Sequence, residues 1–76
     1  MPHVQIKCIE GKTEEQKLEV AEKIAKAIAD SFGYSTSAVS VAITDIPRDK
    51  WKTAVWDTEI SPQMDQLYLK PGYNLD

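Results

Sequence analysis

The chain has 76 residues, of which 9 are basic and 12 acidic, so its net charge at neutral pH is −3. This balance disfavours nucleic-acid binding, which needs a basic surface. No apolar run is long enough for a membrane span or the core of a signal peptide. One cysteine and one histidine can form neither an internal disulfide nor a structural zinc site. These features indicate a cytoplasmic protein.

The length of the chain predicts one domain, residues 1–76, that self-associates. A folded chain of this size hides only about 60% of its unfolded surface, which leaves a monomer marginally stable. Small domains compensate with disulfides, metals or a partner subunit. Because the sequence offers neither of the first two, we expect association with a second copy.

The first predicted element is a strand at residues 2–9. Apolar side chains occupy alternate positions along it: Pro2, Val4, Ile6 and Cys8. The positions between them carry His3, Gln5, Lys7 and Ile9. Such alternation predicts a strand with one apolar face. His3 points away from the Pro2 face and is expected in solvent or at an interface, and Cys8 is expected to act as a small buried hydrophobe.

The second predicted element is a helix that begins at a capping box, Thr13 to Gln16, and ends at Gly33. An apolar stripe recurs along it at three- and four-residue steps: Leu18, Ala21, Ile24, Ala25, Ile28 and Phe32. Each large member of this stripe would contribute about 2 kcal/mol on burial. We therefore expect Leu18, Ile24, Ile28 and Phe32 to form the main core.

A second strand is predicted at residues 38–46, which alternate β-branched and small side chains. Strand, helix and strand form a β-α-β unit with parallel strands. Two strands leave an unpaired edge, whereas two copies would make four strands under two helices. The expected fold class is α+β, with a four-stranded sheet completed by dimerisation.

The rest of the chain is predicted to end in a short helix. Pro47 breaks the strand, and Trp51 and Trp56 follow; we expect Trp56 to be buried in a core or interface. Ser61 before Pro62 is typical of an N-cap followed by proline in the first helical position. A turn at residues 70–73 ends the pattern.

Pro2 has a second possible role besides opening a strand. If Met1 is removed, Pro2 carries a secondary amine at the N-terminus. An α-amino group has a pKa of about 7.7 to 8.0, and apolar surroundings lower it because they disfavour the charged form. Such an amine is a suitable general base at cellular pH. Proline at the start of a strand is also common for structural reasons alone.

Several short motifs occur in a specific order: Pro2 opening a strand, Glu10-Gly11-Lys12, Glu15-Gln16-Lys17, and Ser37 to Val41. Together they resemble the 4-oxalocrotonate tautomerase family. The tail resembles the PptA-type branch through Trp51, Trp56-Asp57, Glu59-Ile60, Pro62-Gln63-Met64 and Lys70-Pro71-Gly72-Tyr73. The resemblance covers essentially the whole chain and implies a single domain with the tautomerase (MIF-like) fold.

The resemblance implies enol–keto tautomerisation of a 2-oxo acid without a metal or organic cofactor. Pro2 would be the general base and then the acid. Lys12 would hold a substrate carboxylate, although the family has arginine there, and lysine offers a point charge in place of a planar fork. Trp51 would form the pocket wall.

Ser40 stands where the family has a second arginine. A pocket with Trp51 and only one candidate cation favours an arylenolpyruvate-like monocarboxylate over a dicarboxylate. Whether the Ser40 hydroxyl, a backbone amide or water stabilises the enolate oxygen stays open.

Three other hypotheses remain beside a homodimeric tautomerase. Pro2 could serve a hydratase or dehalogenase, or act as a nucleophile that forms an iminium with a carbonyl compound. The chain could also be a non-catalytic oligomerisation domain that retains Met1. The family also forms hexamers, but the additional C-terminal helix could cover the surface on which dimers would stack, which favours the dimer.

Overall fold

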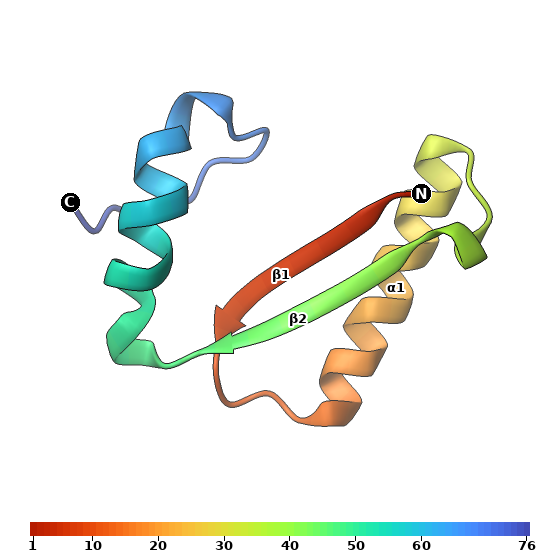
Figure 1. Ribbon diagram of the computed structural model, residues 1–76, viewed down its shortest axis with the longest axis horizontal. Helices are drawn as coiled ribbons and strands as arrows, with labels where there is room; N and C mark the ends of the chain where they lie inside the picture. The colour runs from red at the N-terminus through yellow and green to blue at the C-terminus, as the bar shows by residue number, and fades with distance from the viewer.

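The computed structural model describes residues 1–76 and has a β-α-β unit followed by a helical tail (Figure 1). The β-α-β unit consists of β1 (His3–Ile9), α1 (Glu14–Phe32) and β2 (Ser40–Ile46). Three 3-10 segments and one π-helix complete the chain: η1 (Thr36–Ala38), η2 (Arg48–Lys50), the π-helix η3 (Lys52–Ile60) and η4 (Ser61–Gln66). No helix is both long and apolar enough to cross a lipid bilayer.

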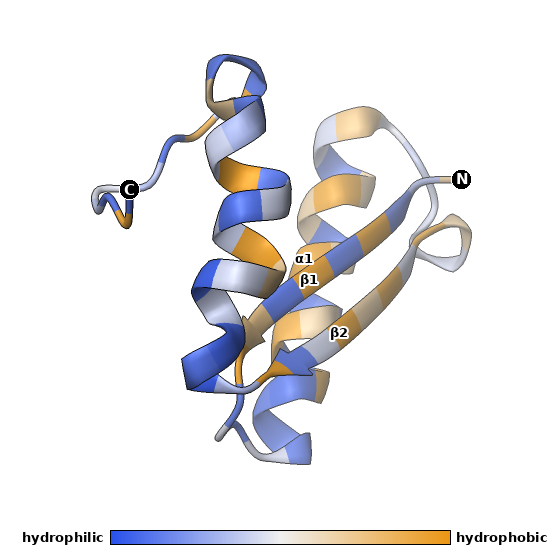
Figure 2. Ribbon diagram, turned by 60° about the vertical axis from the view of Figure 1, so that its left-hand side comes forward, coloured by the Kyte–Doolittle hydropathy of each residue, from blue (hydrophilic) through white to orange (hydrophobic).

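The two strands pair in parallel, as the sequence predicts. Their register runs from His3 beside Ser40 to Ile9 beside Ile46. The N–H of Ser40 donates to the carbonyl of Pro2 at 3.1 Å, which extends the ladder to the start of the chain. Polar and apolar residues alternate along β1 (Figure 2). The second strand is shorter than predicted, because Ala38 belongs to η1.

Local signals fix both ends of α1. The Thr13 hydroxyl accepts from the N–H of Gln16 at 3.1 Å, and the Gln16 side chain accepts from the N–H of Thr13 at 2.9 Å. These two bonds satisfy backbone donors that a helix start leaves unpaired. Gly33 ends the helix with φ of 79°, a left-handed conformation that glycine adopts without strain. The predicted capping box and helix end are confirmed.

The predicted core is wrong in part. Ile24 and Ile28 are half-buried, whereas Leu18 is 61% and Phe32 67% exposed. Leu18 lies roughly 80° to 120° around the helix from the two isoleucines, given 3.6 residues per turn. Phe32 is in the last turn of a helix about 28 Å long, whereas each strand spans about 23 Å. The helix therefore extends past the sheet that would cover Phe32 (Figure 1).

The chain alone has an open shape. Its radius of gyration is 14.0 Å, against about 11 Å for a compact domain of this length. Its accessible surface is 5892 Å², about 1,200 Å² more than a compact monomer of this mass exposes. Only Ala29, Val55 and Trp56 are buried. A large apolar surface therefore remains for another molecule to cover.

The C-terminal segment folds on itself. Figure 1 shows it on the β1 side of the sheet, away from α1. The indole N–H of Trp56 donates to Asp76 at 2.8 Å, and the ring centroids of Trp56 and Tyr73 lie 5.3 Å apart. Trp56 is fully buried, as expected, and it connects the end of the chain to η3.

The predicted N-cap at Ser61 is wrong. The π-helix η3 continues directly into η4, so Ser61 has helical angles, φ of −59° and ψ of −47°. Its hydroxyl instead donates to the Asp76 carboxylate at 3.2 Å. A short helix does follow, and Pro62 lies in its first turn. The sequence pattern places this helix correctly but misses the nine-residue π-helix before it.

Candidate active site

Pro2 lies at the amino end of β1. It is half-buried, and its carbonyl accepts the hydrogen bond from Ser40 described above. The preceding Met1 is 89% exposed. With Met1 attached the nitrogen of Pro2 is an amide without basicity; with Met1 removed it is an amine at a position fixed by the strand ladder.

Ser40 lies beside Pro2 and makes a second contact that the sequence did not predict. His3 Nδ1 and Ser40 Oγ are 2.6 Å apart, and the two residues are paired across the strands. The contact therefore follows from the parallel register. His3 had been expected in solvent or at an interface; it is exposed, and it also restrains the Ser40 hydroxyl.

Lys12 and Trp51 lie at the opposite end of the sheet, where they line an open cavity of about 620 Å³, here called the Lys12–Trp51 cavity. Trp51 comes from the turn after β2, and its indole N–H donates to the Tyr73 hydroxyl at 3.2 Å. Tyr73 and Leu75 bring the chain end to the same cavity. The tail therefore orients the tryptophan that the sequence assigns to the pocket wall.

Four cations line this cavity: Lys7, Lys12, Arg48 and Lys52. Lys7 is paired with Glu59, and Lys52 lies 3.1 Å from Asp57. Neither Lys12 nor Arg48 makes an ion pair within the chain. The expectation of only one candidate cation is therefore wrong, because the turn after Pro47 brings Arg48 to the cavity. The signal was in the sequence, since Arg48 precedes Trp51 by three residues.

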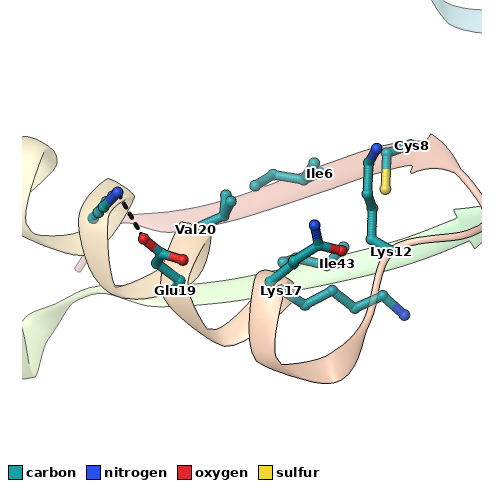
Figure 3. A pocket seen from close by; sticks show the side chains of 9 residues that line it. Ile6, Cys8, Lys12, Lys17, Glu19, Val20 and Ile43 are labelled. Atoms are coloured by element: carbon teal, nitrogen blue, oxygen red, sulfur yellow. Dashed lines mark ion pairs between the residues drawn. The ribbon is translucent and has the colours of Figure 1, made fainter.

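A second cavity forms a groove along β1, of about 410 Å³, here called the β1 groove. Its apolar lining is Ile6, Cys8, Val20 and Ile43. Figure 3 shows Val20 of α1 on the side of Ile6, and Lys12 beside Cys8 at one end. Lys12 and Cys8 line both cavities, so the β1 groove leads to the Lys12–Trp51 cavity.

The two other lysines along the β1 groove are each paired with a carboxylate. Lys23 lies 2.9 Å from Glu19 (Figure 3). Lys17 donates to Asp45 at 2.6 Å, and this hydrogen bond raises the pKa of the Lys17 ammonium above its ordinary value against the opposing effect of burial. Lys17 is thus held in its charged form by Asp45. The β1 groove therefore presents mainly apolar surface to another molecule.

The predicted site residues fall into two groups within one chain. Pro2 and Ser40 are at the amino end of β1, and Lys12 and Trp51 are beyond its carboxyl end. The seven steps of about 3.3 Å from Pro2 to Ile9 put about 23 Å between these two ends. Neither the β1 groove nor the Lys12–Trp51 cavity is lined by Pro2. No group of three or more His, Cys, Asp or Glu side chains is arranged to hold a metal ion.

The fold and the proline that opens its first strand define a small α+β protein of β-α-β architecture. Comparison with known proteins specifies the family. The tautomerase family, described as "Tautomerase enzyme", matches residues 2–55. Tautomerase PptA of Enterobacter sp. (strain 638) is 46% identical over 76 residues, which cover 99% of this chain and 100% of the relative.

Tautomerase PptA of Klebsiella pneumoniae (strain 342) is 49% identical over the same share of both chains. A solved structure from work on the 4-oxalocrotonate tautomerase isozymes of Methylibium petroleiphilum has 44% sequence identity and a TM-score of 0.64. The match covers 66% of this chain and 81% of that one. The chain therefore belongs to the tautomerase family and is an isomerase, and the predicted α+β fold with its β-α-β unit is confirmed.

Proposed function

We propose that the protein is an enol–keto tautomerase that needs no cofactor and acts on a 2-oxo acid with an apolar or aromatic arm, an arylenolpyruvate-like monocarboxylate. The observation that carries the proposal is the position of Pro2. It is half-buried and held at the start of β1 by the hydrogen bond from Ser40. A secondary amine restrained in this way is pre-oriented for proton transfer.

The reaction requires Pro2 to accept one proton from the substrate and then to return one proton to it. After Met1 is removed, the neutral amine of Pro2 takes the proton of the enol hydroxyl, and the oxygen forms the carbonyl of the 2-oxo acid. The electron pair of the carbon–carbon double bond then takes a proton from the prolinium nitrogen. The amine is regenerated, and no atoms are gained or lost. Lys12 binds the carboxylate electrostatically and Trp51 contacts the arm, whereas the Ser40 hydroxyl is held 2.6 Å from His3 Nδ1.

This assignment needs two copies of the chain, because Pro2 and Lys12 are at opposite ends of β1. We infer a homodimer in which the free edges of two β1 strands pair antiparallel. Such a pairing, centred near Ile6, would put Pro2 of one chain opposite Glu10 of the other. Glu10 lines the Lys12–Trp51 cavity. Each cavity would then receive its base from the other chain.

The surface of the chain supports pairing through β1. α1 packs mainly against β2, which leaves the inner face of β1 only half-covered. The β1 groove is the result, and the helix of a second chain, which lies on the same face of the shared four-stranded sheet, would fill it. The excess surface of about 1,200 Å² is comparable with the roughly 800 Å² per partner that a standard interface buries. A molar mass of two chains by light scattering is expected; six chains would contradict the dimer.

The activity is tested by ketonisation of phenylenolpyruvate, followed by ultraviolet absorbance from pH 5 to 9. The protein used must lack Met1 by intact mass. We expect a rate that rises with pH as the amine loses its proton, and a 10²- to 10⁴-fold loss in Pro2→Ala, roughly the contribution of a general base. A rate no higher than buffer would contradict the proposal.

A matched control separates the amine from the proline ring. An uncleaved N-terminal extension keeps the Pro2 side chain but turns its nitrogen into an amide. This protein is expected to be as inactive as Pro2→Ala. Full activity with the extension would exclude Pro2 as the base. If Pro2 instead forms an iminium, reduction with borohydride in the presence of a carbonyl compound adds a covalent mass to the peptide that begins with Pro2.

A further inference from the structure

We propose that Arg48 binds the substrate carboxylate together with Lys12, and so supplies the guanidinium that the site lacks at position 12. The inference deepens the proposed function and rests on it for the identity of the substrate. Arg48 is the only arginine in the chain. It lies in the short turn η2, outside the strands and helix that carry the family motifs.

The turn that carries Arg48 is well defined. Pro47 has φ of −56°, and its carbonyl accepts from the N–H of Lys50 at 2.9 Å. The carbonyl of Arg48 accepts from the N–H of Trp51. In a 3-10 turn, side chains three positions apart project on the same side. Arg48 and Trp51 are three apart, and both line the Lys12–Trp51 cavity.

The charges around the cavity leave Arg48 available. Lys7 and Lys52 already have carboxylate partners, whereas Arg48 has none within 4 Å. Asp49 and Glu10 also line the cavity, but neither pairs with Arg48. Asp49 follows Arg48 directly, so its side chain leaves the 3-10 turn about 120° away. An anion that enters beside Trp51 therefore has an unpaired guanidinium and an unpaired ammonium to bind.

The chemistry of the two cations differs in a useful way. A guanidinium is a planar fork that holds both oxygens of a carboxylate, whereas an ammonium is a point charge. Arg48 would fix the plane of the carboxylate, and Lys12 would add charge. The arm of the substrate would then lie against Trp51. Arg48 thus restores the two-point recognition that lysine at position 12 cannot give.

The test compares Arg48→Gln with Lys50→Gln, because Lys50 lies in the same turn, makes no ion pair and does not line the cavity. We expect Arg48→Gln to raise KM for phenylenolpyruvate about tenfold with kcat little changed, since the lost interaction binds substrate and transition state alike. Arg48→Lys should recover part of the loss. Lys50→Gln should match the wild type. A wild-type KM in Arg48→Gln would overturn the inference.

A binding measurement keeps this inference separate from the proposed activity. Calorimetry with 3-phenylpropanoate and its neutral amide measures recognition of the carboxylate without any reaction. Arg48→Gln should weaken binding of the carboxylate about tenfold and leave the amide unaffected. Such a result without tautomerase activity would overturn the proposed function alone. Equal affinity of the wild type for acid and amide, or equal loss for both, would overturn the role of Arg48.

Discussion

The β-α-β unit and the C-terminal segment solve the problem of a small core in different ways. The β-α-β unit, residues 3–46, contains the regular elements but only one buried residue, Ala29. The C-terminal segment, residues 47–76, is irregular but buries Val55 and Trp56. The regular unit depends on a partner to cover it, whereas the irregular segment packs its aromatic rings on itself.

The candidate site residues are also divided between the β-α-β unit and the C-terminal segment. The family match ends at residue 55, and the solved Methylibium structure matches 66% of the chain, whereas the PptA relatives match nearly all of it. Pro2, Ser40 and Lys12 belong to the β-α-β unit. Arg48 and Trp51 begin the C-terminal segment, and Tyr73 near its end binds Trp51. The segment therefore shapes the cavity wall and has more than a packing role.

The largest effect on stability is expected in the C-terminal segment. Trp56→Ala removes a fully buried ring and its hydrogen bond to Asp76 and should cost about 3 to 5 kcal/mol. Trp56→Phe, which keeps most of the apolar volume, should cost less. Urea unfolding at fixed protein concentration measures both. If Trp56→Ala cost less than about 1 kcal/mol, the segment would not be anchored by this ring.

A charge in the β1 groove should separate the chains. Val20 is 44% exposed and lines the groove, so Val20→Glu is tolerated in a monomer but would bury an unpaired charge in the proposed dimer. We expect the molar mass to fall to that of one chain at micromolar concentration, with loss of activity. Val20→Ala keeps the groove apolar and is the control. An unchanged mass in Val20→Glu would exclude pairing at this surface.

The smallest effect on stability is expected from a change of pH that removes the charge of Lys17. Its pKa is raised in the folded chain by the hydrogen bond to Asp45, so the contribution to stability is present at neutral pH. That contribution is lost as the pH rises above the ordinary lysine value of about 10.5 and through the folded pKa. Unfolding at pH 8 and pH 11.5 measures it. Lys17→Gln should show a smaller decrease in stability than the wild type over this range.

The sequence predicted those features that local chemistry decides. Thr13 and Gln16 form their capping box within four residues, and Gly33 ends α1 through its own backbone freedom. The alternation along residues 2–9 defines both faces of β1. Burial of Leu18 and Phe32 could not be predicted in the same way. It depends on how far α1 extends past the strands and on which side of the helix meets β2.

The candidate site could be predicted only in part, because it too depends on how distant parts of the chain are arranged. Pro2, Lys12, Ser40 and Trp51 were assigned by resemblance, and the chain places them at the two ends of the sheet. Arg48 was missed because its relevance depends on a turn that brings it beside Trp51. The π-helix before Ser61 was missed because the apolar side chains of residues 52–60 show no helical periodicity along the sequence.

The most direct test of the two-chain site mixes two inactive proteins. One carries Pro2→Ala, and the other carries Lys12→Gln with Trp51→Ala. After the chains are unfolded and refolded together, each mixed dimer should hold one intact site, made of Pro2 from the second chain and Lys12 and Trp51 from the first. We predict recovery of about a quarter of wild-type activity, because random pairing makes half of the dimers mixed. Light scattering and intact mass that show mixed dimers without any recovered activity would contradict the account.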